Sequence, residues 1–410
     1  MAGEYRGRGP RAQAAREEGS PPTLTVNGYS EEWLGKGFPW VYADEIEAKS
    51  SSPQPGQLVH LRSRKGAVLG VGLWDEGRVA VRRFRRDVGP IDGELLRERL
   101  RLARARRPLP PQTTAWRWVH GESDDLPGIR VNVWGDEVSL VLDSPGLRVL
   151  AEPLCAAILE QQAAKRVWLS WRPHSADAEL LAPEEVRQLH GPPPEGAVWV
   201  EELGLKVGVR PQDGADVGLF CDMRDTRAWL KPHWAGRRVL NTFAHTGMFS
   251  LCAAAHGAAE VMTVDLSPAY LERAADNLRA NGLDPAAHTF WAEDSFKALD
   301  ALRRKNRLFD LVIVDPPSFS HGPQGTFSVM RDLGRLTAAA LRVLAPGGWL
   351  LLACNHGKLS PKEFSKQILD GATRAGQSLR IVHSGSTPVD FPAALDFPES
   401  RYLKVWILAS

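Results

Sequence analysis

The spacing of hydrophobic and polar positions divides the chain into three stretches. In the first, residues 24–86, apolar and polar side chains alternate in short runs that are interrupted by Gly66 and by Glu76 with Gly77. A period of two predicts strands, and several short strands separated by turn residues predict a small barrel or curled sheet. A helical turn that ends at Gly37 is expected after the first strand.

The second stretch mixes helical and strand periods. A helix predicted over residues 93–107 leads into a strand, a polar turn and a hairpin that reverses at 134–136. A second helix over 147–162 and a further strand follow, and another hairpin turns at 203–204. This order predicts a small α+β unit.

From residue 218 onwards, strands and amphipathic helices alternate. That order predicts a doubly wound parallel sheet. The last two apolar runs are joined by a loop alone, so one of the two strands should be antiparallel. The five preceding strands are expected near 237–241, 260–264, 288–291, 309–314 and 347–353.

Length and composition fit a multidomain globular protein. The 410 residues are 43% hydrophobic and 24% charged, and no run of 18 apolar residues predicts a membrane span. Residues 1–22 are rich in Gly, Pro, Arg and Glu, which predicts a disordered tail without a signal peptide and therefore a cytoplasmic protein. Three domains are predicted behind this tail, over 23–100, 101–205 and 206–410.

Positive charge is concentrated near the N-terminus. Residues 1–110 hold 20 Lys and Arg against 14 Asp and Glu, although the net charge of the whole chain is only +2. The guanidinium group suits phosphate, so the run Arg82, Arg83, Arg85 and Arg86 beside Phe84 is predicted to bind nucleic acid. The arginines of helix 93–107 are explained equally well by a solvated helix face.

A ligand site is predicted within residues 239–265, which are expected to form strand, loop, helix and strand. Gly247 in the loop allows a ligand close to the backbone, and Asp265 closes the second strand, where an acid accepts hydrogen bonds from ribose hydroxyls. The loop lacks the G-x-G-x-x-G that grips a pyrophosphate. A ligand with a ribose but no phosphate fits better, and S-adenosyl-L-methionine is the commonest one.

Further candidates stand at the ends of the other predicted strands, where ligands of open α/β sheets bind. Asp294 is expected to hold the adenine amine, although it would serve equally as a helix N-cap. Asn241, Phe243 and Thr246 accompany Gly247 after the first strand.

Two residues suggest chemistry on a nucleic acid base. Asp315 is followed by two prolines, Pro316 being the first, which fix the loop for a planar group such as a flipped base. Cys354 ends the fifth strand, and a thiolate adding to carbon 6 of a pyrimidine makes carbon 5 nucleophilic. An acid at ring nitrogen 3 would assist, and Asp315 is placed for it. The competing interpretation of Cys354 is a small buried residue that closes an apolar strand.

Several motifs resemble known families. The segments G-x-P-W-V-Y at 37–42 and G-x-x-L-G-x-G-x-W at 66–74 resemble the PUA domain, an RNA-binding barrel. Together with GESDDLPG, DVGLFCDMRDTR, VLNTFAHTG, DPPSF and the cysteine after the fifth strand, they resemble the bacterial large-subunit rRNA cytosine-5 methyltransferases along nearly the whole chain.

The resemblance implies a class I, Rossmann-like methyltransferase domain preceded by a PUA-like β-barrel and a small α+β domain. It adds Phe220, Asp222 and Arg224 to the expected cofactor site. This chain has Asp216-Val217-Gly218 where the family usually has Lys-Thr-Gly, Met223 in a D-Q-R motif, and A-C-N in place of S-C-S around Cys354.

Other segments, DPPSFS and VMRD among them, resemble the sister enzymes that methylate ring nitrogen 7 of guanine in rRNA and carry asparagine in place of Cys354. The sequence therefore predicts an S-adenosylmethionine-dependent rRNA base methyltransferase, with cytosine carbon 5 preferred over guanine nitrogen 7. A non-catalytic RNA-binding assembly factor and a methyltransferase of DNA or a small molecule are the alternatives. The expected partner is RNA of the large ribosomal subunit. No membrane is expected, and homodimer formation stays open.

Overall fold

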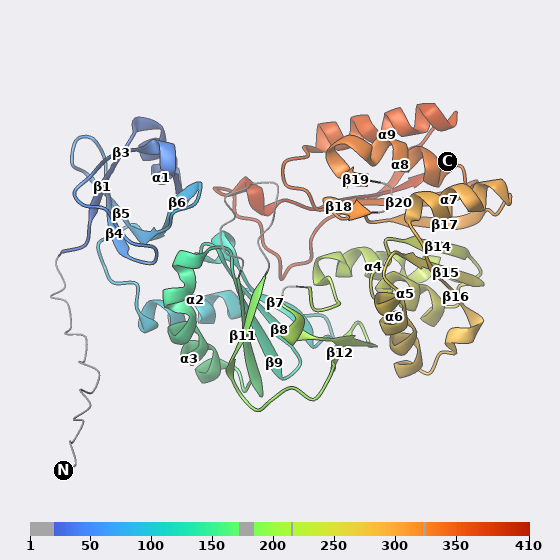
Figure 1. Ribbon diagram of the computed structural model, residues 1–410, viewed down its shortest axis with the longest axis horizontal. Helices are drawn as coiled ribbons and strands as arrows, with labels where there is room; N and C mark the ends of the chain where they lie inside the picture. Colours follow the sequence, from blue (N-terminus) through green and yellow to red (C-terminus); the bar gives the residue numbers. More distant parts are fainter. Residues whose placement is uncertain (1–19, 172–183, 215, 323–324) are drawn as a thin grey trace, which may run out of the picture.

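The computed structural model describes residues 20–171, 184–214, 216–322 and 325–410 (Figure 1). Most of the tail predicted over 1–22 lies outside these ranges. Three large sheets follow one another along the chain, and buried apolar side chains pack against each of them. In the part of the chain that the structure describes, no helix is long and apolar enough to cross a membrane.

The N-terminal sheet confirms the prediction of a small curled β module. Its six strands lie in the order β2-β6-β5-β4-β1-β3. Helix α1 (Gly28–Lys36) begins at Asn27, whose side chain accepts from the Ser30 amide, and ends at Gly37 in the left-handed conformation. The strands are β1 (Thr23–Val26), β2 (Trp40–Tyr42), β3 (Ile46–Lys49), β4 (Leu58–Arg62), β5 (Val68–Trp74) and β6 (Val79–Arg85).

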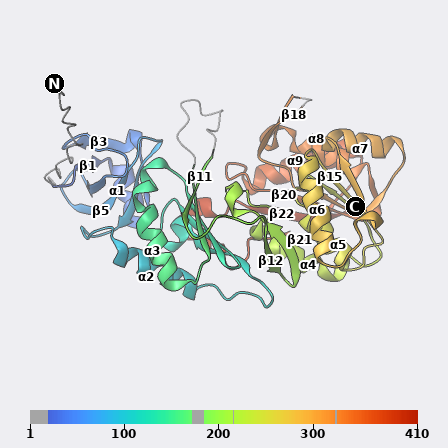
Figure 2. The ribbon, with the colours of Figure 1, turned by 60° about the horizontal axis from the view of Figure 1, so that its bottom comes forward.

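The middle unit is a five-stranded sheet, β11-β10-β9-β8-β7, with α2 (Gly93–Ala105) and α3 (Ala151–Gln161) side by side against it (Figures 1 and 2). Residues 147–150, expected to be helical with α3, belong instead to a 3-10 helix over Pro145–Leu150. The strands are β7 (Ala115–His120), β8 (Ile129–Trp134), β9 (Glu137–Leu142), β10 (Arg166–Trp171) and β11 (Glu185–His190).

The hairpin of β12 (Val198–Glu202) and β13 (Leu205–Val209) connects this unit to the C-terminal sheet and reverses at Leu203 and Gly204, as the sequence indicates. The predicted boundary at 205 and 206 therefore falls inside a hairpin, and that at 100 and 101 falls inside α2.

The C-terminal sheet confirms the doubly wound prediction. Its order is β16-β15-β14-β17-β20-β22-β21, and β22 runs antiparallel to both of its neighbours. The strands are β14 (Arg238–Thr242), β15 (Glu260–Asp265), β16 (Thr289–Ala292), β17 (Phe309–Val314), β20 (Leu344–Cys354), β21 (Arg380–Gly385) and β22 (Lys404–Ala409).

Helices cover both faces of this sheet (Figure 1). On one face lie α4 (Arg224–Leu230), α5 (Met248–Ala255) and α6 (Pro268–Ala280), and on the other lie α7 (Ser295–Arg304), α8 (Val329–Leu341) and α9 (Pro361–Ala375). A short hairpin of β18 (Phe319–Gly322) and β19 (Gly325–Ser328), which the sequence did not indicate, precedes α8.

The segment between β21 and β22, residues 386–403, reaches out of the C-terminal sheet and touches both other units; we call it the crossover loop. Asp390 accepts from the Arg117 amide of β7, and the ring of Phe397 lies 4.8 Å from that of Trp40 in β2. The crossover loop therefore joins the three sheets into one body.

Candidate active site

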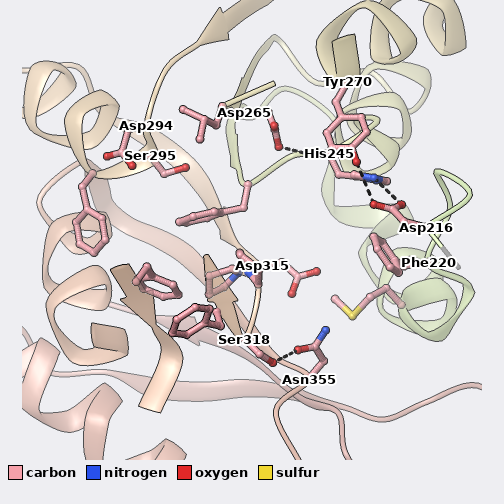
Figure 3. Close-up of a pocket in the computed structure, with 18 of the residues that line it drawn as sticks. Asp216, Phe220, His245, Asp265, Tyr270, Asp294, Ser295, Asp315, Ser318 and Asn355 are labelled. Carbon is pink, nitrogen blue, oxygen red and sulfur yellow. Dashed lines mark hydrogen bonds and ion pairs between the residues drawn. The ribbon is translucent and has the colours of Figure 1, made fainter. Parts of the chain in front are cut away.

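A cavity of about 730 Å³ opens at the carboxyl ends of β14, β15 and β17 (Figure 3). The wall includes seven residues predicted as site residues from the sequence: Phe220, Asp222, Phe243, Asp265, Asp294, Asp315 and Pro316. We call it the main cavity.

The loop after β14 has an unusual backbone. Phe243 and His245 both have φ of 53°, and Gly247 has φ of 74° at the start of α5. A Cβ on Gly247 would lie 2.6 Å from that of Ala274, so both the conformation and the space require glycine here. The result is a tight loop that brings backbone to the cavity wall.

Asn241 and Thr246 support this loop from behind. Asn241 donates from Nδ2 to Ser250 at 3.0 Å, and the Thr246 hydroxyl donates to the Gly218 carbonyl. Both side chains are buried and line a small adjoining pocket of about 70 Å³ instead of the main cavity.

Asp265 is held in place at the end of β15. Its Oδ2 accepts from the His245 amide at 2.7 Å, and its Oδ1 accepts from the Ser267 amide at 2.9 Å. Each carboxylate oxygen has a further lone pair, so acceptors remain for a pair of hydroxyls. Asp294 caps α7 through a bond from the Lys297 amide and also lines the cavity, so one side chain fits both interpretations.

Three cavity residues that the sequence did not single out form a polar cluster. His245 lies 2.9 Å from Asp216, which also accepts from the Tyr270 hydroxyl at 3.1 Å (Figure 3). Burial acts to raise the pKa of Asp216, but the bonds from His245 and Tyr270 outweigh it and leave that pKa below its ordinary value. The sequence did contain a signal for Asp216, because this residue stands where the family usually has the lysine of Lys-Thr-Gly.

Asp315 and Cys354 end the neighbouring strands β17 and β20, but only Asp315 lines the main cavity. Burial, with Asp222 nearby, raises the pKa of Asp315 to about 7. Cys354 is only 1% exposed and packs in an apolar cluster, while the next residue, Asn355, lines the wall. The predicted nucleophile therefore lies directly behind the cavity surface, not on it.

The Cys354 thiol nevertheless has polar neighbours. The His356 amide donates to Sγ at 3.5 Å, and Lys404 stands opposite in β22. Burial raises the pKa of the thiol, His356 and Lys404 counteract that rise, and Asp315 adds to it.

The motif at 220–224 separates into cavity and structural residues. Phe220 is 48% exposed, with its ring 5.1 Å from His245, and Asp222 accepts from the Tyr402 hydroxyl at 2.7 Å. Arg224 is buried and donates to Asp390 at 2.7 Å and to the Ala115 carbonyl at 2.7 Å. It lies outside the wall of the main cavity, because these partners hold it beneath the crossover loop.

The four predicted RNA-binding arginines also differ. Arg82 is buried and donates to Ser144, whereas Arg83 is buried and donates to two carbonyls, with its pKa lowered to about 10 by burial. Arg85 pairs with Asp87, and Arg86 is exposed. Arg83, Arg85 and Arg86 line a hollow of about 620 Å³ between the N-terminal and middle sheets, together with Arg99 and Arg106.

The main cavity fits S-adenosylmethionine. Its volume suits a ligand of that size, and Asp265 and Asp294 offer hydrogen-bond acceptors. The Gly247 loop allows the backbone to come close to the ligand. Phenylalanine rings at 243, 296, 319 and 327 supply an apolar surface.

Comparison with known proteins supports S-adenosylmethionine as the ligand. The chain matches the family described as S-adenosylmethionine-dependent methyltransferase over residues 157–404 and a PUA-like domain over residues 24–86. Its relatives include proteins named ribosomal RNA large subunit methyltransferase I. Those of Shewanella denitrificans and Tolumonas auensis are each 31% identical, over 90% and 93% of this chain and 95% and 98% of theirs.

Solved structures share the whole fold. A crystal structure of a methyltransferase complexed with SAH has a TM-score of 0.84 at 23% identity and covers 95% of this chain and all of its own. A methyltransferase from Streptococcus mutans has a TM-score of 0.82 at the same identity and coverage. The chain therefore belongs to the S-adenosylmethionine-dependent methyltransferases, enzymes that use this cofactor as methyl donor, and it carries a PUA-like domain ahead of the catalytic fold.

Proposed function

We propose that this protein methylates a base of large-subunit rRNA, at carbon 5 of a cytosine, with Cys354 as nucleophile and Asp315 as acid. The observation that carries the choice of base atom is the placement of a thiol and an acid at the ends of adjacent strands, β17 and β20, beside the main cavity. The choice of RNA is supported by the names of the relatives and by the PUA-like domain.

S-adenosylmethionine, when bound, supplies an electrophilic methyl group, and the residues that would hold it are Phe220, Phe243, Asp265 and Asp294. Asp265 would accept from the ribose hydroxyls, and Asp294 from the adenine amine. Asn241, Thr246 and Gly247 would contribute by fixing the loop, and Pro316 by shaping the opposite wall.

The chain's own residues supply the activation of the base. The Cys354 thiolate forms a bond to carbon 6 of cytosine, while Asp315 gives a proton to ring nitrogen 3. This places electron density on carbon 5. After methylation, the proton on carbon 5 passes to solvent, ring nitrogen 3 returns its proton to Asp315, and expulsion of the thiolate restores the aromatic ring. A pKa near 7 suits Asp315 to this role, because a large part of the carboxyl is protonated at neutral pH.

Methylation of guanine nitrogen 7 would need neither group, because that nitrogen is already nucleophilic. A pair of experiments separates the alternatives. With RNA that contains 5-fluorocytidine, the wild-type protein should form a covalent adduct, because the fluorine on carbon 5 blocks the final elimination, and Cys354→Ala should form none. Methyl transfer to guanine without an adduct would overturn the assignment to cytosine.

Mass spectrometry of rRNA from a strain without the gene identifies the modified nucleotide directly. A loss confined to one 5-methylcytosine of the large subunit is the expected result. An unchanged set of rRNA modifications, together with no binding of S-adenosylmethionine in calorimetry, would instead support an assembly factor without catalytic activity. Gel filtration with light scattering tests the homodimer, which stays a prediction.

A further inference from the structure

A second cavity of about 610 Å³ adjoins the main cavity. Four residues line both: Asp216, Phe220, Asp222 and Asn355. The two cavities therefore meet along a shared wall, and the junction lies beside Asp315 and next in sequence to Cys354.

Apart from the residues shared with the main cavity, most of the walls of the second cavity come from the middle unit and the crossover loop. Strands β7 and β8 of the middle sheet contribute Arg117, His120, Arg130 and Asn132, and the crossover loop contributes Phe391, Phe397, Glu399 and Tyr402. The cavity is thus closed on one side by the middle unit, whose function is not explained by cofactor binding.

Most polar groups of the middle-sheet wall are fixed by one another. Arg117 donates from Nε to Asn132 at 2.5 Å, its Nη1 lies 2.9 Å from His120 Nδ1, and its guanidinium lies over the Phe391 ring. The pKa of His120 is well below its ordinary value because of burial and the Arg117 charge, so its Nδ1 accepts and its Nε2–H is available to donate.

Arg130 has donors to spare. Its side chain is 39% exposed and pairs with Asp143 through Nη2, while its buried Nε finds no hydrogen-bond partner among the described residues. Because a guanidinium carries five N–H donors, this cation can bind an oxyanion without first breaking the Asp143 contact.

The polar side chains at the junction are also held in place by hydrogen bonds. The Tyr402 hydroxyl donates to Asp222, and the Ser318 hydroxyl donates to Asn355 Oδ1 at 2.8 Å. That bond turns the Asn355 Nδ2 amide into the main cavity, as Figure 3 shows. The amide therefore offers donors beside Asp315, where the acceptors of a pyrimidine would stand.

We propose that the second cavity receives the target nucleotide of the RNA, with Arg130 on a backbone phosphate and Asn355 donating to the base at the junction. The base then reaches through the junction toward the methyl donor, and the middle unit acts as the RNA-binding wall of the active site. This inference rests on the proposed function, because it takes the substrate to be RNA.

The test uses two substitutions that break the same ion pair. Arg130→Ala removes the proposed phosphate contact, whereas Asp143→Asn keeps the guanidinium and frees it from its acid. Both lose the Arg130–Asp143 pair, so any structural cost is common to them. Arg101→Ala, on the exposed face of α2 with a partner in Glu98, is the control for loss of one arginine elsewhere.

The readouts are the dissociation constant for in vitro transcribed large-subunit rRNA in filter binding at several salt concentrations, and that for S-adenosylmethionine in calorimetry. Arg130→Ala should weaken RNA binding about tenfold and reduce the slope of log Kd against log salt by about one unit. Asp143→Asn should bind RNA at least as tightly as wild type, and all variants should bind S-adenosylmethionine equally.

Two results would overturn the inference: Arg130→Ala matching Arg101→Ala, or both members of the pair weakening RNA binding alike. Because filter binding does not depend on methyl transfer, the outcome is separate from that of the proposed function. A protein that binds this RNA through Arg130 but transfers no methyl to it would contradict the proposed function and leave the second cavity as an RNA site.

Discussion

Lys404 stands directly opposite Cys354 in the antiparallel pair of β20 and β22, so both side chains project from the same face of the sheet. Lys404 is 9% exposed, and its ammonium group donates to the carbonyls of His356 at 2.9 Å and Tyr402 at 2.7 Å. A cation is thus fixed beside the proposed nucleophile.

Replacement of Lys404 by Met should shift the activity profile to higher pH. The groups that act on the thiol are Lys404 and the His356 amide, which favour the thiolate, and Asp315, which opposes it. Without the cation the pKa of Cys354 rises, and each unit of rise lowers the thiolate fraction about tenfold below that pKa. Initial rates of methyl transfer from pH 6 to 10 measure the shift. Lys404→Arg keeps the positive charge, so its activity profile should lie close to that of wild type. Equal profiles for wild type and Lys404→Met would contradict this role.

Asp315 should make the stability of the protein depend on pH in an unusual direction. Its pKa of about 7 in the folded chain lies above the ordinary 3.8. Between these values the folded chain holds a proton that the unfolded chain releases, so the free energy of unfolding falls as pH rises from about 4 to about 7.

The variant Asp315→Asn should lose this dependence, and its melting temperature should rise relative to wild type across that window. Asp310→Asn is the control with the opposite sign, because Arg238 holds the pKa of Asp310 below its ordinary value. That stabilisation is present above the ordinary pKa and is lost as pH falls through the lower one. If the melting temperatures of wild type and Asp315→Asn change with pH in the same way, the pKa of the Asp315 carboxyl is not raised in the folded protein.

The C-terminal sheet was predictable because its evidence is local. Apolar runs such as 309–314 and turn residues such as Gly247 mark each strand and its end, and parallel strands place those ends on one edge. Strand β11 was missed because four of its six residues are polar and none is buried, so no apolar alternation indicates it. It is a strand because β10 pairs with it.

The roles of individual polar side chains were less predictable, because they depend on partners far away in the sequence. Arg224 stands in a motif that implied a cofactor contact, yet it binds Asp390, 166 residues later. Arg82 and Arg83 stand in a basic run, yet both are buried, and Arg82 donates to Ser144 of the middle unit. Periodicity locates an element but does not show which of its charges a distant loop will bury.

Asp265→Asn should weaken binding of S-adenosylmethionine by at least tenfold. The amide offers one acceptor oxygen where the carboxylate offers two, and the His245 and Ser267 amides already occupy both carboxylate oxygens. Isothermal titration calorimetry gives the dissociation constant. Asp300→Asn, an exposed acid on α7, should bind as wild type does. Unchanged affinity in Asp265→Asn would exclude the ribose contact.

Gly247→Ala should destabilise the protein more than Gly282→Ala. The two glycines have nearly the same φ, 74° and 73°, so both substitutions share a backbone cost of about 1 kcal/mol. Only at Gly247 does the new Cβ meet a neighbour, Ala274, which adds about 1–3 kcal/mol of overpacking. Urea unfolding measures the difference. Equal losses of unfolding free energy in the two variants would show that the loop accommodates the new methyl group without overpacking.

Arg224→Met should lower stability without changing affinity for S-adenosylmethionine. The substitution leaves Asp390, fully buried, without its cation, and removes one partner of the buried Glu202. Breaking a buried ion pair in this way costs about 3–5 kcal/mol. The side chain does not line the main cavity, so the dissociation constant, measured in calorimetry well below the melting temperature, should stay within about twofold of wild type.

The double substitution Arg224→Met with Asp390→Asn removes the orphaned charge and should recover part of the stability, because a neutral amide is less costly to bury than an unpaired carboxylate. A large loss of affinity for S-adenosylmethionine in Arg224→Met, with little change in urea unfolding, would instead support a contact between Arg224 and the cofactor. The expected opposite pattern makes it the anchor of the crossover loop, which carries Tyr402 to Asp222 and closes the second cavity.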